Sequence, residues 1–259
     1  FSAEYGGRIS SIMDIKTIDG NKKKIGGKLS ANTFGSKLFV EGPLSKSGKS
    51  SFILSGKTSY LDKSSELFYK YPILYFDEKG LPYSYTDLYG KMSMYGNNGS
   101  KFNVFGFNFQ DNVNYDAISH LQWNSSGVGS EFILIPGGSP VLIEGNFAYS
   151  SYNISFDEKA SPLRESGING YNMGFDFTYF QPKGKIKYGF DIHGFSTNFI
   201  TYNSVNTPIT QDENTSEFSA YVNYQYSGLR WIVEPGIRLQ KYTLGISPEP
   251  RLGVQFIAT

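Results

Sequence analysis

A two-residue alternation of aromatic and polar side chains recurs along this chain, and it restricts the folds that the chain can adopt. In one segment, Phe175 and Phe177 alternate with Asp176 and Thr178. The pattern recurs in four further segments, 103–110, 185–193, 218–226 and 229–240. Because successive side chains of a strand point to opposite faces of a sheet, each segment predicts a strand with one aromatic face and one face of polar residues or glycine.

Composition also favours strands over helices. The 259 residues include 20 Tyr, 21 Phe and 29 Gly, a combination typical of twisted, closely packed strands. No run of 18 or more apolar residues is present, so the sequence predicts no membrane-spanning helix. The alternation fits either a soluble β-sandwich with its aromatic faces in a core or a transmembrane β-barrel with those faces in lipid.

The lengths of the predicted connections favour the barrel. Short turns at 45–49, 95–99, 136–139, 181–184 and 226–228 alternate with longer connections at 62–84, 157–167 and 201–216. Outer-membrane barrels have short turns at one end and longer loops at the other. The chain is therefore predicted to be all-β, an antiparallel up-and-down sheet of about twelve strands with almost no helix. The strands are placed at about 25–33, 37–43, 51–61, 85–96, 101–112, 117–135, 139–156, 168–181, 184–200, 216–227, 229–243 and 248–259.

Charge does not indicate a nucleic-acid-binding protein. The net charge is +1 and the only basic cluster is Lys22–Lys24, which provides no field to attract nucleic acid. The range 42–50 resembles a phosphate-binding loop, but five residues separate its first Gly from Gly-Lys where four are required. It also joins two predicted strands, so we interpret it as a turn.

The ionisable residues do not indicate an enzyme. Cysteine is absent, and His120 and His193 lie far apart without a cluster of carboxylates, so neither a metal site nor a general base is predicted. Four carboxylates lie on polar strand faces: Glu131, Glu144, Asp176 and Asp191. They leave a paired-carboxylate hydrolase geometrically open, but no feature selects a pair. We predict no catalytic residue, no cofactor and no metal.

Four segments carry a family resemblance. The range 4–17, closed by Asp19-Gly20-Asn21, resembles the end of the plug domain in TonB-dependent receptors, particularly those of the Bacteroidetes type. Ranges 38–44, 50–62 and 248–253 resemble later segments of the same family, in the same order. Between about 111 and 216 the resemblance rests on strand pattern.

The resemblance implies a fold and a function. Members of this family have a barrel of about 22 strands around a folded plug, so residues 1–20 correspond to the C-terminal end of the plug and 21–259 to the N-terminal part, about half, of a transmembrane barrel. The implied function is TonB-dependent, energy-coupled import of a nutrient across the bacterial outer membrane. The implied partners are outer-membrane lipid, a periplasmic TonB-type energy transducer that binds an N-terminal segment outside this chain, a surface lipoprotein, and a solute that is a glycan, a metal chelate or a vitamin.

Three other functions stay open at this point. A passive outer-membrane pore or structural barrel would share the architecture without the plug. A soluble or surface-exposed β-sandwich adhesin would share the alternation, and an outer-membrane hydrolase would use the carboxylates.

Two groups of residues are candidates for binding. The long connection at 62–84 is strongly aromatic, and its candidate ligand-binding residues are Tyr69, Tyr71, Tyr75, Phe76 and Tyr83. Such a loop either packs on itself or captures a ligand. The candidates for contacts with the plug or the lumen are Arg8, Arg230, Glu234 and Arg238. The last three are predicted to form a charged stripe on one strand face, which could alternatively be an internal ion-pair ladder.

The alternation also predicts which face each side chain occupies. The residues expected on the convex, lipid-facing side are Phe105, Phe107, Phe175, Phe177, Tyr188, Phe190, Trp231 and Val233. Those expected on the concave side are Asp176, Asp191, Arg230, Glu234 and Arg238. Residues 1–18 lack this alternation and contain Gly6-Gly7, so we expect them to lie inside the curve of the sheet and to add no wall strand.

Overall fold

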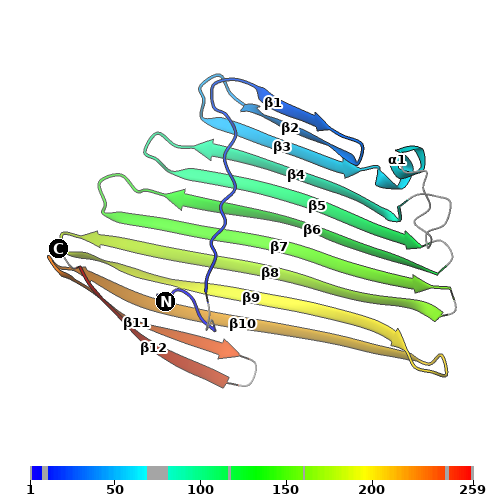
Figure 1. Cartoon of the computed structure of the whole chain (residues 1–259). Helices are drawn as coiled ribbons and strands as arrows, with labels where there is room; N and C mark the ends of the chain where they lie inside the picture. Colours follow the sequence, from blue (N-terminus) through cyan, green and yellow to red (C-terminus); the bar gives the residue numbers. More distant parts are fainter. Residues whose placement is uncertain are drawn as a thin grey trace.

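The computed structural model describes residues 2–7, 11–68, 81–115, 118–159, 161–242 and 245–257. These residues form one sheet of twelve strands, in which each strand pairs antiparallel with its neighbours in sequence (Figure 1). The strands are β1 Gly26–Ala31, β2 Gly35–Pro43, β3 Ser50–Ser59, β4 Tyr83–Tyr95, β5 Lys101–Tyr115, β6 Ser119–Leu134, β7 Val141–Glu158, β8 Ser161–Gln181, β9 Gly184–Tyr202, β10 Pro208–Ser227, β11 Trp231–Tyr242 and β12 Gly245–Phe256. The predicted all-β, up-and-down fold is confirmed, and so is the number of strands.

Among the described residues, one helix accompanies the sheet. Helix α1, Leu61–Phe68, follows β3 at one end of the sheet. No helix in the described part of the chain is both long and apolar enough to cross a membrane. The end of the sheet that carries α1 is called the helix end below, and the opposite end the turn end.

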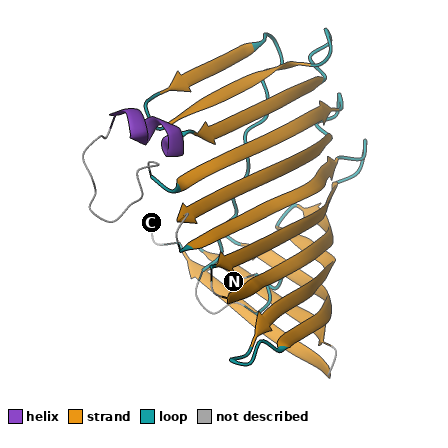
Figure 2. Ribbon diagram, turned by 90° about the vertical axis from the view of Figure 1, so that its right-hand side faces the viewer, coloured by secondary structure: helices purple, strands orange, loops and turns teal. Residues whose placement is uncertain are grey.

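The sheet is curved and does not close (Figure 2). β1 and β12 each pair with only one strand among the described residues. The described residues contain only three buried hydrophobic side chains, Ala3, Ile53 and Tyr221, whereas many large apolar side chains are exposed. A single sheet without an apolar core between two layers is not a β-sandwich.

Two predicted long connections are wrong. The ranges 157–167 and 201–216 are mostly strand, because β7 and β8 are separated only by residues 159–160 and β9 and β10 only by residues 203–207. These stretches carry polar side chains on both faces and therefore show no alternation. They are nevertheless strands, because each pairs with a neighbouring strand of similar length. The pairing of β10 with β9, for example, begins with Pro208 opposite Tyr202. Only the connection between β3 and β4 is long.

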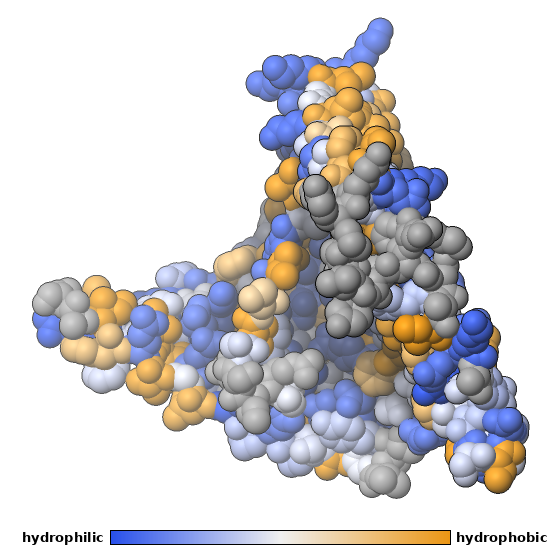
Figure 3. Space-filling model, turned by 45° about the vertical axis from the view of Figure 1, so that its right-hand side comes forward, coloured by the Kyte–Doolittle hydropathy of each residue, from blue (hydrophilic) through white to orange (hydrophobic). Residues whose placement is uncertain are grey.

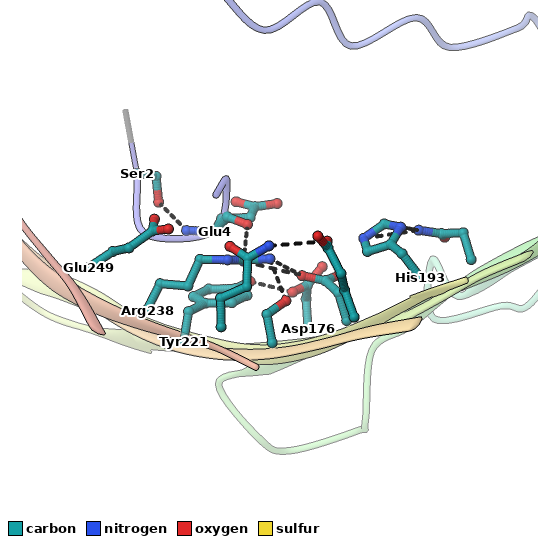
Figure 4. A network of polar contacts seen from close by, with 12 residues as sticks. Ser2, Glu4, Asp176, His193, Tyr221, Arg238 and Glu249 are labelled. Carbon is teal, nitrogen blue, oxygen red and sulfur yellow. Dashed lines mark hydrogen bonds and ion pairs between the residues drawn. The ribbon is translucent and has the colours of Figure 1, made fainter. Parts of the chain in front are cut away.

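Registers assign each strand residue to a face. Arg238 lies opposite Tyr221, Tyr221 opposite Gly189, and Gly189 opposite Asp176. Residues directly opposite one another share a face, and Figure 4 shows Asp176, Tyr221 and Arg238 on the inner side of the curve, toward the N-terminal segment. We call this face the inner wall and the convex face the outer face.

The predicted faces are confirmed for β8, β9 and β11 and are wrong for β5. Phe175 and Phe177 pair with Phe190 and Tyr188 on the outer face, where Trp231 and Val233 also point. Phe105 and Phe107, however, share the inner wall: Phe105 lies opposite Lys91, which contacts the N-terminal segment. The error arises because apolar side chains lie on both faces of the first half of β5, with Phe102 and Val104 pointing outward, so aromatic content does not identify the lipid side.

Candidate functional site

The N-terminal segment, residues 2–7 and 11–20, crosses the inner wall from β11 toward β4 (Figure 1). Its described residues form no strand and pair with no strand of the sheet. This agrees with the expectation that they lie inside the curve and add no wall strand. Side chains of the wall hold the segment at two places, which we call the Glu4 anchor and the Asp19 anchor.

At the Glu4 anchor, three cations of the wall hold the segment by charge and by hydrogen bonds. The Lys187 ammonium lies 2.7 Å from the Glu4 carboxylate, and Arg238 Nη1 donates to the Glu4 carbonyl at 2.7 Å. Arg251 of β12 donates to the Ser2 carbonyl at 3.1 Å. Hydrogen bonds from charged groups are the stronger kind, so this anchor needs no backbone ladder.

Arg238 is the centre of a buried polar network (Figure 4). It is only 4% exposed, lies 3.3 Å from the Asp191 carboxylate and donates to the Ser219 hydroxyl. A buried guanidinium is stable only when it is paired and hydrogen-bonded. A Cβ added at Gly6 would lie 2.4 Å from Arg238 Nε, so the segment can approach this side chain closely only because residue 6 is glycine.

A second contact strengthens the wall beside Arg238. The Tyr221 hydroxyl donates to the Asp176 carboxylate across Gly189, the residue that lies between them in the register. A Cβ at Gly189 would come within 2.4 Å of the Asp176 carboxylate oxygen. The missing side chain therefore allows a hydrogen bond that spans two strand spacings.

At the Asp19 anchor, lysines from adjacent strands converge on one carboxylate. Lys91 of β4 and Lys101 of β5 lie 2.9 Å and 2.6 Å from Asp19. Lys91, which is 4% exposed, also donates to the Thr17 carbonyl at 3.0 Å. Partial burial alone would raise the pKa of the Asp19 carboxyl, but the hydrogen bonds from Lys101 and Lys91 outweigh it and hold the pKa at about 2.

Between the segment and the wall lies a polar cavity of about 690 Å³ near the Glu4 anchor. The space-filling view shows the hollow between the two arms of the sheet (Figure 3). The wall side of the cavity includes Asp176, Asp191, His193 and Arg238. His193 Nδ1 lies 2.9 Å from the Asn172 amide. No group of three or more metal-ligating side chains occurs in the described ranges.

Toward the helix end, the inner wall becomes aromatic. Phe107 and Phe109 stack with their ring centroids 4.9 Å apart, and the registers place Tyr152, Trp123 and Phe199 on the same face. Phe109, Tyr152 and Phe199 are between 36% and 42% exposed. Exposed rings grouped on a concave surface can stack on a bound molecule, so we call this region the aromatic wall.

The predicted site residues are brought together only in part. Arg238 contacts the N-terminal segment through the Glu4 carbonyl. Glu234 instead accepts hydrogen bonds from Asn223 and Gln225 of β10, and Arg230 is an exposed residue of the turn before β11. Because strand β11 begins one residue later, the strand register assigns Arg230 to neither face, and its place in the predicted stripe stays a prediction.

The remaining candidates lie at or beyond the edge of the described residues. Tyr83 begins β4, is 45% exposed and has its hydroxyl 3.2 Å from that of Tyr115. Four aromatic candidates, Tyr69, Tyr71, Tyr75 and Phe76, lie outside the described residues, and so does Arg8.

Apart from Arg238, sequence reasoning missed the residues of both anchors. Glu4, Asp19, Lys91, Lys101 and Lys187 were not candidates, because single charges in alternating strands look like ordinary polar positions. One signal was available for Lys91: a lone lysine between Tyr89 and Ser93 on what proves to be the inner wall. A charge there needs a partner from another segment.

Comparison with solved structures places the fold among outer-membrane receptors. Over 91% of this chain, the alcaligin outer-membrane receptor of Bordetella pertussis superposes with a TM-score of 0.64 at 9% identity. The FrpB iron transporter of Neisseria meningitidis gives a TM-score of 0.62 at 12% identity over 94% of the chain. A Serratia marcescens hemophore receptor gives 0.58 at 11% identity over 90%.

The chain spans 40%, 46% and 41% of the lengths of these three proteins. At such identities the likeness establishes the fold, which matches the barrel portion of these receptors. Neither a protein-family model nor a curated protein matches the sequence.

Proposed function

We propose that this chain is part of a TonB-dependent importer of the bacterial outer membrane, of the Bacteroidetes type. Residues 1–20 are then the end of the plug and residues 21–259 a portion of the barrel wall, with Lys22–Lys24 at the periplasmic rim. The outer face contacts lipid. Solute enters from the helix end, and a periplasmic TonB-type partner supplies the pull that moves the plug.

One observation carries this proposal: the segment that crosses the inner wall is attached by side chains and not by a backbone ladder. Ion pairs at Glu4 and Asp19 hold it at two places, while its described residues contribute no strand. Such contacts can break without disrupting any strand pairing of the wall. A passive pore needs no such internal segment, so its presence favours the importer.

The aromatic wall is the proposed place of solute contact on the barrel. It lies on the same face as the anchors but nearer the helix end, where Tyr83 begins β4. In the sequence, the aromatic candidates Tyr69, Tyr71, Tyr75 and Phe76 precede Tyr83. Rings can stack on sugar faces or on the flat parts of chelates and corrinoids. A binding screen of the intact receptor against glycans, metal chelates and corrinoids identifies which class it takes.

A reversible covalent lock tests the import mechanism. A Cβ added at Gly236 would lie 2.8 Å from Ala3 Cβ, shorter than the ~3.5–4.5 Å between Cβ atoms in disulfides, so a small outward shift of the N-terminal segment brings the pair into bonding range. In the full-length receptor, oxidised Ala3→Cys/Gly236→Cys is expected to bind solute at the cell surface but not to import it, and a reductant restores import. Each single cysteine variant is the matched control. Normal import with the disulfide fully formed would contradict a moving segment and favour a passive route.

A further inference from the structure

The outer face changes character along β6, β7 and β8. One row across these strands holds Val128, Tyr149 and Tyr171, and the next row toward the helix end holds Ser126, Ser151 and Asn169. From this boundary toward the turn end, the outer face is mostly aromatic and aliphatic. From the boundary toward the helix end, amides and hydroxyls continue for several rows. A lipid-facing apolar band that ends at tyrosines is the usual border of a membrane interior.

A small amide-lined pocket lies on the outer face, on the helix-end side of this border. Its volume is about 260 Å³, below the ~300–1,000 Å³ of pockets for drug-sized ligands. Asn153 and Asn198 flank Gly167 in the register, and Gln122, Ser155 and Glu165 complete the polar rim. Within the described ranges the side chains of Gln122, Glu165 and Asn198 make no hydrogen bond, so their polar atoms are available to a ligand.

An apolar dent lies beside it on the same outer face. Three glycines, Gly56, Gly90 and Gly106, form its floor, and Leu38, Leu54 and Leu88 form its sides. Its volume is about 490 Å³, and the three leucines are each more than half exposed. The missing side chains of adjacent strands thus leave an apolar depression in a surface that is otherwise filled by large residues.

Asn108 and Asn124 connect the dent to the pocket. Asn108 borders the dent, and its amide nitrogen lies 3.2 Å from the Asn124 amide oxygen, which in turn borders the pocket. One amphiphilic molecule can therefore place a chain in the dent and a headgroup in the pocket.

The charges on the outer face indicate which class of lipid headgroup the pocket can bind. In the described ranges no Lys or Arg occupies an outward-facing position on β5 to β10, whereas amides and hydroxyls are frequent there. A phosphate headgroup would require cations or ion-mediated contacts. Amides offer both donors and acceptors, which match the hydroxyls of an uncharged sugar.

We propose that the outer face holds one glycolipid with a neutral sugar headgroup, its acyl chain in the Gly56–Gly90–Gly106 dent and its sugar against Asn153 and Asn198. The inference rests on the proposed placement of the outer face in lipid. It concerns a ligand that stays bound outside the wall, separate from the solute that passes within.

The test uses the full-length receptor in vesicles of phosphatidylethanolamine that contain equal, minor amounts of diglucosyl diacylglycerol and phosphatidylglycerol. Lipids that stay bound after gentle extraction are counted by native mass spectrometry. We expect enrichment of the glycolipid over phosphatidylglycerol. Asn198→Leu removes sugar contacts and Gly106→Leu fills the dent, where a Cβ meets only ordinary contact at 3.5 Å; each should lower the enrichment about tenfold.

Matched controls lie on the same face outside the two sites. Asn214→Leu removes an outward amide of β10 and Val104→Leu adds bulk on β5, and both should retain the enrichment. Equal retention of both lipids by the unaltered receptor, or equal loss in all four variants, would overturn the proposal. Energy-coupled import without enrichment defeats only the glycolipid site, whereas failure to insert into vesicles defeats the lipid placement and the site together.

Discussion

Strands β5 and β8 carry the same phenylalanine alternation but turn it in opposite directions. Phe105 and Phe107 of β5 face the inner wall, whereas Phe175 and Phe177 of β8 face outward. On β8 the intervening residues are Asp176 and Thr178, which need partners inside; on β5 they include Val104 and Gly106, which tolerate lipid. Alternation therefore separates two faces, and only the residues between the aromatics reveal which face is the outer one.

The largest expected effect comes from placing a charge on each of these two strands. Phe175→Arg puts a cation on the outer face, between Phe132 and Phe190, whose ring centroids lie 5.8 Å and 5.3 Å away. An arginine at the bilayer midplane of a barrel costs about 2–4 kcal/mol, and we expect a matching loss in urea unfolding from vesicles. Phe107→Arg should leave most of that stability intact, because its side chain enters an aqueous lumen. Equal losses in both variants would show that β5 also faces lipid.

The Asp19 anchor should give the next largest effect. Lys91→Met removes a buried cation that binds the N-terminal segment, so the Asn21 amide, which donates to the Glu41 carboxylate at the end of this segment, should exchange hydrogen faster. The coupling energy between Lys91→Met and Asp19→Asn in a double-mutant cycle should lie within about 0.5–3 kcal/mol. Lys23→Met alters an exposed lysine and serves as the control. Unchanged exchange in Lys91→Met would mean that the segment is held elsewhere.

A smaller effect is expected on the aromatic wall. Phe109→Ala removes one stacking ring and should weaken solute binding by about 0.5–1.5 kcal/mol, with little change in unfolding. Phe177→Ala, an aromatic deletion on the outer face, should leave solute affinity unchanged while lowering stability. Binding is measured on the intact receptor by calorimetry with the solute found in the screen. If Phe177→Ala weakened solute binding and Phe109→Ala did not, the solute would bind on the outer face of the wall.

The smallest expected effect at neutral pH comes from protonation of the Asp19 carboxyl. Because the two lysines lower the pKa of the Asp19 carboxyl to about 2, below its ordinary value of about 3.9, the ionised carboxylate stabilises the anchor fully above pH ~4. This contribution is lost as the pH falls through ~2. NMR titration of the Asp19 carboxyl in the native protein should show that midpoint, and Lys101→Gln should raise it. A midpoint near the unperturbed value would mean that the two lysines do not bind this carboxylate.

Much of the fold followed from the sequence, since period-two alternation and turn residues specify strands locally. All twelve strands were anticipated, although β8 and β10 begin seven and eight residues earlier than predicted, at Ser161 and Pro208. The first residues of these two strands show no alternation of apolar and polar side chains, and they are strand only because they pair with neighbouring strands. The anchors depend on contacts between residues more than 70 positions apart, such as Lys91 with Asp19, and alternation contains no information about such pairs.

The two anchors also define how a pull would be distributed along the N-terminal segment. From Arg238 on β11 to Lys91 on β4 is seven strand spacings, roughly 34 Å at about 4.8 Å each, whereas the fifteen steps from residue 4 to residue 19 can extend to about 50 Å. The tether therefore has slack. When the segment is pulled from its N-terminal side, the force first acts on the Glu4 anchor alone. The Asp19 anchor comes under force only after the chain between residues 4 and 19 has straightened. Two modest bonds opened one after the other require a lower peak force than the same bonds opened together.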